Sequence, residues 1–270
     1  MILASPFPLG VALGIATVIA YVALALTPRQ LSRRTAQGLL GLAWLLHALT
    51  LAVGLLAGKP HFGFGPALSI TAWLVLTVYA VEDRMFPELR VRRVLALLGV
   101  ATVLLALAFP GPQLHVLASP WLPLHLALGI ASYGLFAAAV VHAWLLGRTE
   151  KQIRHAQTSF SGLPLLTLER LTFRFVSAGF VLLSATLLAG LVFTETLYGM
   201  RLGQSWQWSH KTVFSILAWI TFAVLLAGRL RFGWRGRTAT HVLYAGAVLL
   251  LLAYVGSRFV LEVVLHRSAA

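Results

Sequence analysis

The sequence predicts an all-α polytopic membrane protein: a bundle of eight transmembrane helices with both termini in the periplasm. Three observations lead to this fold class. The 270-residue chain is 59% hydrophobic and only 10% charged, whereas soluble domains are about half apolar and about a quarter charged. The apolar residues gather in eight long runs. The basic residues concentrate in alternate gaps between these runs, as they do in proteins that cross a bilayer several times.

Each apolar run suits one membrane-spanning helix, which needs about 20 residues with a range of roughly 17–25. Helices are expected rather than strands, because the strands of a membrane barrel would alternate in polarity. The first run follows no basic residue, so we interpret it as a retained span and not as a cleaved secretion signal. A Pro-Gly-Pro sequence at 110–112 ends the fourth run. The runs lie near residues 8–27, 37–57, 65–81, 93–109, 121–146, 171–196, 211–228 and 238–263.

The gaps between the runs predict an orientation. Sixteen of the 21 Lys and Arg residues lie in or beside the first, third, fifth and seventh gaps. Cytoplasmic loops carry such an excess of positive charge, so these gaps are expected in the cytoplasm and both ends of the chain outside the inner membrane. The longest polar segment, residues 147–168, is expected to be a cytoplasmic loop. The chain then forms a single membrane domain over residues 1–270, without repeats.

The amino-acid composition excludes several kinds of site and partner. Without cysteine, the chain has no disulfide, no thiolate metal site and no site for covalent heme attachment. The topology accounts for the net charge of +14, so nucleic acid is not an expected partner. The sequence shows no nucleophile triad, phosphate-cradling glycine loop or carboxylate pair, and it therefore does not predict an enzyme.

Four of the nine histidines are candidates for holding a ligand. The expected topology places His125, His210 and His266 near the outer membrane boundary, on three different helices. His47 lies about halfway along the second helix. Histidines that gather at one depth from several helices suit a metal or a heme. The alternative for His47 is a hydrogen-bonded core residue, and the alternative for His125 is a helix interface built on the small residues that follow it.

Other polar and aromatic residues are expected at the same outer level. Trp206 and Trp208 precede the seventh run, where they form either an interfacial aromatic belt or a platform for a porphyrin ring. Arg258, Glu262 and His266 are spaced four apart, so they share one helix face. Arg258 is placed to meet an anionic group such as a carboxylate. The alternative is an ion pair with Glu262 that only locks the helix.

Three blocks of this sequence resemble the cytochrome c assembly proteins, the heme-handling family of the CcsA and CcmC type. Residues 125–136, His-Leu-Ala-Leu-Gly-Ile-Ala-Ser-Tyr-Gly-Leu-Phe, are similar to the family's segment in which a periplasmic-side histidine precedes a Ser-Tyr pair. Residues 206–228, which begin Trp-Gln-Trp-Ser-His-Lys-Thr, resemble its tryptophan-rich segment and the following helix. Residues 233–266, from Gly-Trp-Arg-Gly-Arg to Gly-Ser-Arg-Phe-Val-Leu-Glu-Val-Val-Leu-His, resemble its last helix, which ends in a second periplasmic-side histidine.

The resemblance implies a heme held near the periplasmic face of the membrane. This heme is expected to be b-type and bound without a covalent link, and the expected partners are the lipid bilayer and other cytochrome c assembly proteins. The implied site residues are the axial-ligand candidates His125 and His266, with His210 or His47 as alternatives, the ring-stacking candidates Trp206 and Trp208, and the propionate-binding candidates Lys211 and Arg258.

The chain departs from the family at two places. Ser-His-Lys-Thr stands at 209–212 where the family has Asp-Pro-Lys-Glu, and Ala227 stands where CcsA-type proteins have a membrane histidine. Both departures favour the small eight-helix HemX-like branch, whose members hold heme or assist assembly without attaching heme to protein. The sequence therefore predicts a heme-binding inner-membrane protein of cytochrome c biogenesis. The alternatives are a non-catalytic membrane scaffold of the assembly machinery and a transporter of a metal or small solute.

Overall fold

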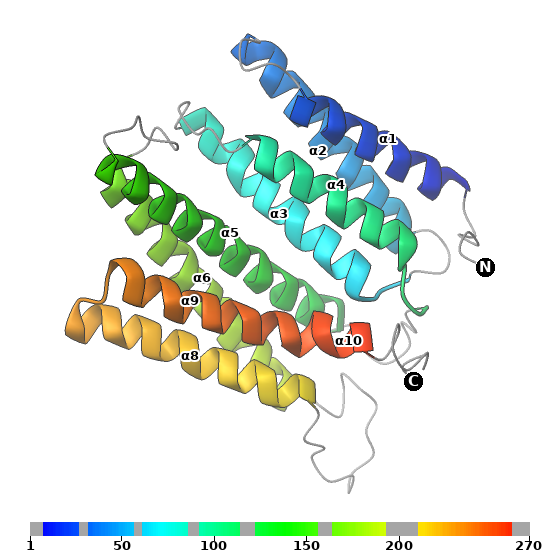
Figure 1. Cartoon of the computed structure of the whole chain (residues 1–270). Coiled ribbons are helices and arrows are strands. Elements are labelled where there is room, and N and C mark those ends of the chain that lie inside the picture. The colour runs from blue at the N-terminus through cyan, green and yellow to red at the C-terminus, as the bar shows by residue number, and fades with distance from the viewer. Residues whose placement is uncertain are drawn as a thin grey trace, which may run out of the picture. The chain divides into compact units, whose positions relative to one another are not determined.

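The computed structural model describes residues 8–26, 32–56, 61–85, 92–113, 122–155, 164–192 and 210–260. The long elements in these ranges are all helices, and one isolated β-bridge joins His61 to Gln113. This confirms the all-α fold class, and each of the eight apolar runs coincides with a helix (Figure 1). The elements are α1 (Pro8–Leu26), α2 (Arg33–Leu56), α3 (Phe64–Met85), α4 (Arg92–Ala108), α5 (Leu122–Arg154), α6 (Leu165–Val192), α8 (His210–Phe232), α9 (Gly236–Leu251), the π-helical turn η1 (Leu252–Gly256) and α10 (Ser257–Phe259).

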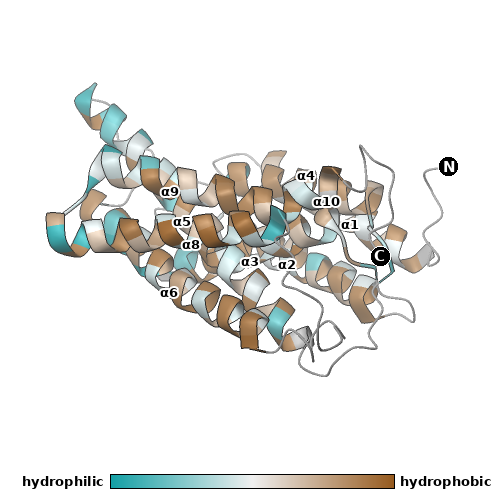
Figure 2. Cartoon of the chain, turned by 90° about the horizontal axis from the view of Figure 1, so that it is seen from below, coloured by the Kyte–Doolittle hydropathy of each residue, from teal (hydrophilic) through white to brown (hydrophobic). Residues whose placement is uncertain are grey.

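Seven of the described helices are long and apolar enough to cross a bilayer: α1, α2, α3, α5, α6, α8, and α9 with its π-helical turn. The remaining helix, α4, has 17 residues, at the lower end of the length that spans a hydrocarbon core. Figure 2 shows that the helices are apolar over most of their length. The placement of both termini in the periplasm stays a prediction.

The expectation of a loop over residues 147–168 is wrong at both ends, because α5 continues to Arg154 and α6 begins at Leu165. The end of α5 consists mostly of good helix formers, and Arg154 forms an ion pair with Glu150 one turn earlier. An apolar run ends where charged residues begin, but a helix can continue past that point. The run therefore predicted the part of α5 that suits a bilayer and underestimated the length of the helix.

The chain divides into two compact units, the first containing α1 to α4 and the second containing α5, α6 and α8 to α10. In the first unit, α1 packs against α2 and α4, and α3 packs against α4 and α2. Trp44 of α2 stacks on Trp73 of α3, with 5.1 Å between the ring centroids. The Trp44 indole N–H donates to the Thr77 hydroxyl at 2.8 Å, so a polar group within these spans has a partner. The single membrane domain over 1–270 stays a prediction.

An aromatic pair lies at the centre of the second unit. Phe136 of α5 and Phe222 of α8 are fully buried, and their rings stack with centroids 3.8 Å apart and 9° between planes. Small residues on the neighbouring helices make room for them: a Cβ added at Gly246 of α9 would lie 2.7 Å from the Phe222 ring, and one added at Gly179 of α6 would lie 3.2 Å from the Phe136 ring. Four helices thus meet around one pair of rings.

The Gly-Trp-Arg-Gly-Arg segment, residues 233–237, joins α8 to α9 in a helical hairpin (Figure 1). Gly233 and Gly236 have positive φ angles of 63° and 55°, which residues with a Cβ rarely adopt. Between them, Trp234 folds back onto α8, where its backbone N–H donates to the Gly228 carbonyl at 3.1 Å. The glycines and the tryptophan of this segment therefore build the hairpin.

We expect Gly228→Ala to destabilise this hairpin. The added methyl group would lie 2.4 Å from atoms of the Trp234 ring, so the ring must shift, at a typical cost of about 1–3 kcal/mol. Thermal unfolding of the full chain in detergent, followed by circular dichroism, should show a lower midpoint. Gly147→Ala in α5 is the matched control, because nothing lies within 4 Å of an added Cβ there. An equal loss in the control would contradict this explanation.

Candidate functional site

His125 lies near the start of α5, where this helix packs against α6. A Cβ added at Gly190 of α6 would lie 3.5 Å from the His125 Cε1 atom, so the edge of the imidazole contacts the glycine. The side chain is half-buried, and its Nδ1 atom is buried. The imidazole is therefore held at the end of the α5–α6 pair rather than extended into solvent.

Lys211 and Tyr254 bring two further helical segments to His125. Lys211 lies in the first turn of α8, and its ammonium group is 5.6 Å from the centroid of the Tyr254 ring in η1, within the range of a cation–π contact. The same ammonium is close enough to His125 to interact with it electrostatically. An imidazole, an ammonium and a phenol from α5, α8 and η1 thus converge at one corner of the second unit. We call these three residues, His125, Lys211 and Tyr254, the outer corner, after the side of the membrane on which the sequence predicts them.

The π-helical turn shapes this corner. The Tyr133 hydroxyl of α5 donates to the Leu250 carbonyl at 2.8 Å, just before the turn begins. The Ser257 hydroxyl, just after the turn, donates to the Ala253 and Tyr254 carbonyls within it at 2.9 and 3.0 Å. Side-chain hydroxyls thus bind one carbonyl before the irregular turn and two carbonyls inside it. Such single π-turns within helices occur frequently at functional sites.

The glycine that follows His125 along the same helix face contacts another helix. A Cβ at Gly129 would lie 3.5 Å from the Thr186 methyl group of α6, and the Ser132 hydroxyl donates to the Gly129 carbonyl at 2.7 Å. This face of α5 therefore forms the small-residue helix interface that the sequence left open as an alternative. His125 lies at the end of that interface, where space for a ligand depends on α8 and η1.

The structure describes some of the predicted site residues and not others. His125 and Lys211 interact electrostatically, and His210 is exposed at the first position of α8. Arg258 has a described backbone in α10, but its side chain lies outside the described part. Trp206, Trp208 and His266 also lie outside the described residues. The axial pair His125 and His266 therefore stays a prediction.

His47 has a different environment, in the first unit. Its side chain is fully buried. Its Nδ1 atom is 2.9 Å from the Tyr21 hydroxyl oxygen and its Nε2 atom is 2.8 Å from the Ser69 hydroxyl oxygen. An imidazole has only two ring nitrogens, so a bond from His47 to a metal would displace one of these hydrogen bonds. The arrangement is that of the hydrogen-bonded core histidine, the alternative weighed for this residue.

Tyr254 is the residue of the outer corner that the sequence analysis did not identify. One signal could have found it, because Tyr254 lies four residues before Arg258 and so extends the stripe of Arg258, Glu262 and His266 by one turn. The π-helical turn itself has no comparable signal. Within the described ranges, no three His, Asp or Glu side chains gather as a metal-binding group.

Comparison with known proteins places these features in a family. A family model described as "Cytochrome C assembly protein" matches residues 34–265. The inner membrane protein YpjD of Escherichia coli strain K12 is 33% identical over 203 residues, covering 74% of each chain. The cytochrome c biogenesis protein CcsA of Synechococcus sp. strain CC9902 is 24% identical over 293 residues, covering 93% of this chain and 94% of that protein. No solved structure matches this chain.

The apolar helices and these relatives define a multi-pass protein of the inner membrane. Because the family model covers most of its length, the chain belongs to the cytochrome c assembly protein family. This confirms the resemblance noted in the sequence, and the similarity to YpjD fits the small branch of that family.

Proposed function

We propose that this protein binds heme at the outer corner and acts in cytochrome c biogenesis as a heme-handling membrane protein. The observation that carries the proposal is the convergence of His125, Lys211 and Tyr254 from three helical segments. The family match supports this role, and so does the name of the CcsA relatives, cytochrome c biogenesis proteins.

The groups at the outer corner fit a heme by their chemistry. A neutral imidazole is a common axial ligand of heme iron, and His125 supplies one. An ammonium can pair with a propionate through a charge-assisted hydrogen bond, and Lys211 supplies that charge. An aromatic ring can pack against a porphyrin, and Tyr254 lies beside the ammonium. The bound heme would supply the iron–imidazole bond, and the chain would supply orientation and charge.

The remaining elements of the proposal come from the sequence and the family. We propose His266 as the second axial ligand, with His210 as an alternative, Trp206 and Trp208 as contacts of the ring, and Arg258 as a second propionate-binding group. The heme would be b-type and non-covalent, because the chain has no cysteine for thioether links. The site would lie near the periplasmic face. The protein would hold heme in place for other assembly proteins and would not itself catalyse attachment.

The visible spectrum of the purified protein, oxidised and reduced, tests this function. The full chain, expressed in cells with sufficient heme or titrated with hemin, should show a Soret band and a spectrum typical of two imidazole ligands. A protein that stays colourless under both conditions would exclude heme binding. If such a colourless protein still copurified with other assembly proteins, the scaffold alternative would replace this proposal.

We expect Lys211→Gln to weaken heme binding without changing the position of the Soret band. The iron ligands would remain, but a charge-assisted contact to a propionate would be lost, which corresponds to roughly tenfold weaker affinity. Hemin titration monitored in the Soret region measures the change. Lys151→Gln, at an exposed position in the extension of α5, is the control. Heme dimethyl ester, which lacks free carboxylates, should bind both variants and the wild type alike. A weakened affinity for the ester would show that Lys211 acts by another route.

A further inference from the structure

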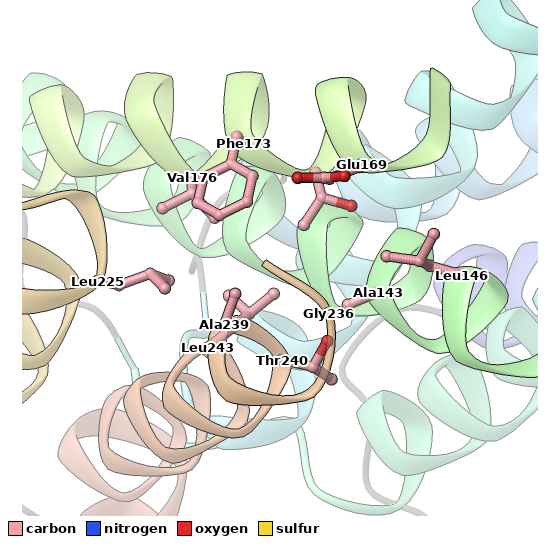
Figure 3. Close-up of a pocket in the computed structure, with 11 residues that line it drawn as sticks. Ala143, Leu146, Glu169, Phe173, Val176, Leu225, Gly236, Ala239, Thr240 and Leu243 are labelled. Atoms are coloured by element: carbon pink, nitrogen blue, oxygen red, sulfur yellow. The ribbon is translucent and has the colours of Figure 1, made fainter. Parts of the chain in front are cut away.

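Helix α9 turns one narrow face toward the rest of the second unit. The buried residues of this face recur at intervals of three or four and are Ala239, Leu243, Gly246 and Leu250. Figure 3 shows two of them, Ala239 and Leu243, beside the same small space as Val176 of α6 and Leu225 of α8. That space has a volume of about 20 Å³, which is room for about one water molecule. The close packing fixes the rotation of α9 about its own axis.

A regular helix would continue this buried face to position 257. The spacing holds through Ala253, which is fully buried in η1, and next reaches Ser257. Ser257 is instead partly exposed. Val260, which would lie at the edge of the same face, is 45% exposed. The residues after η1 have therefore left the register of α9.

The π-helical turn accounts for this change of register. An α-helix has about 3.6 residues per turn, and a single π turn takes in one residue more. Each later residue is therefore rotated by about 100° from its place in an uninterrupted helix. Without the turn, position 258 would line up with Leu251, whose side chain is 49% exposed. With the turn it lines up with Leu250, which is 3% exposed and faces the interior of the unit.

This register matters for Arg258, because the residue carries a charge within the last helix. A charged group is costly on a surface that meets lipid, and it is accommodated on the inside of a helix bundle. The inner face of η1 lies against α8, and that of α9 lies against α5 and α8, the two helices that carry His125 and Lys211. The turn therefore brings position 258 to the side of the outer corner.

Three side-chain hydrogen bonds support the turn. Because each π-type bond spans one residue more than an α-type bond, the turn leaves a backbone carbonyl without its usual donor. The Tyr133 hydroxyl of α5 donates to the Leu250 carbonyl at the start of the turn. The Ser257 hydroxyl donates to the Ala253 and Tyr254 carbonyls inside it. Tyr133 also ties the turn to α5.

We propose that the π-helical turn is the element that positions Arg258 at the outer corner, with Tyr133 and Ser257 as positioning residues that hold the turn. Arg258 would then bind a heme propionate from the last helix, as Lys211 would from α8. This role rests on the proposed heme binding, whereas the register of the last helix does not depend on heme. Separate measurements test the two.

A deletion and an insertion at Gly256 test the role in heme binding, because they should have opposite results. Deletion of Gly256 removes the extra residue, so the helix can continue in regular form with the later residues in their present register, and hemin affinity should be retained. Insertion of one alanine after Gly256 rotates the later residues by about 100° and should weaken hemin binding about tenfold, the effect of losing a charge-assisted contact. Equal effects of the deletion and the insertion would overturn the proposal.

A rescue experiment tests the positioning residues. Tyr133→Phe combined with Ser257→Ala removes the three hydroxyl bonds, so the helix should relax toward the uninterrupted form and bind hemin about tenfold more weakly. Adding the Gly256 deletion should restore the affinity, because the shortened helix needs no π turn. Thr221→Ala, which removes a hydroxyl bound to a carbonyl within the regular helix α8, is the control. A deletion that fails to restore the affinity would remove Tyr133 and Ser257 as positioning residues.

The register can be measured without heme, because the chain has no cysteine. A spin label on Val260→Cys should be accessible to oxygen dissolved in the bilayer, both at the natural length and in the Gly256 deletion, and less accessible in the insertion variant. Equal accessibility in all three would overturn the proposal, whatever the affinities show. The expected accessibilities in a protein that binds no hemin would support the register and contradict the proposed heme binding. A thermal melt of each variant confirms that the protein compared is folded.

Discussion

The His125→Ala variant is expected to lose most of the Soret absorbance of the purified protein. The substitution removes the His125 imidazole, which interacts with Lys211 at the outer corner. A heme with one histidine ligand instead of two should bind more than about tenfold more weakly, a loss of at least about 1.4 kcal/mol. The ratio of Soret to protein absorbance, measured at equal protein concentration, reports the change.

The surroundings of His125 suggest a rescue experiment for this variant. The imidazole contacts Gly190, which has no side chain to fill the vacated space. Free imidazole added to His125→Ala should therefore restore part of the band. His241→Ala, an exposed histidine of α9, should keep the wild-type spectrum. A folded His125→Ala protein with an unchanged Soret band would remove His125 from the ligand set and leave His210 and His266 as the candidates.

The positions of the helices could be predicted from the sequence because their physical cause is local. A run of about 20 apolar residues must form its own hydrogen bonds in a bilayer, and every apolar run became a helix. Helix ends depend on more than hydropathy, and α5 shows the reason. Its last residues are charged, yet the chain remains helical through Arg154 and is supported there by Glu150. Charge density marks the edge of the apolar run, and intrinsic helix propensity sets where the helix stops.

The candidate site could be predicted only in part, because it depends on contacts between helices. The sequence placed His125 and Lys211 at a common level, and in the structure the two side chains interact electrostatically. It could not show that η1 would bring Tyr254 to the same place, since a π-helical turn depends on hydrogen bonds such as that from Tyr133 to Leu250. Helical periodicity also assigned Gly129 and His125 to one face, but it could not show that Thr186 of α6 would contact the glycine.

The hydrogen bonds of His47 could not be predicted from the sequence either, because its partners come from two other helices of its unit. From the sequence, a histidine midway along an apolar helix suits either a ligand or a core hydrogen bond. The structure provides Tyr21 of α1 and Ser69 of α3 as partners, one for each ring nitrogen. The two interpretations predict opposite results for a substitution, and stability and heme binding can be measured separately.

We expect His47→Leu to lower the stability of the protein while its heme spectrum is retained. Leucine is similar in size but leaves the hydroxyls of Tyr21 and Ser69 buried without their partner, at about 1–3 kcal/mol for each group. The total is roughly 2–6 kcal/mol, and each kcal/mol lowers the thermal midpoint by about 2–4 °C in a chain near this size. Thermal unfolding in detergent measures the loss. A stable His47→Leu protein that had lost its Soret band would instead identify His47 as a heme ligand.

The partners of His47 allow a stricter test of the same explanation. If the cost comes from the orphaned hydroxyls, removing them as well should recover stability, because replacing all members of a buried hydrogen-bonded group by apolar groups can be nearly neutral. The triple variant Tyr21→Phe, His47→Leu, Ser69→Ala should therefore unfold at a higher temperature than His47→Leu alone, although it carries more substitutions. Tyr21 and Ser69 are almost completely buried, so neither change would expose the other to water. A triple variant less stable than the single one would show that packing of the imidazole, and not its two hydrogen bonds, stabilises the first unit.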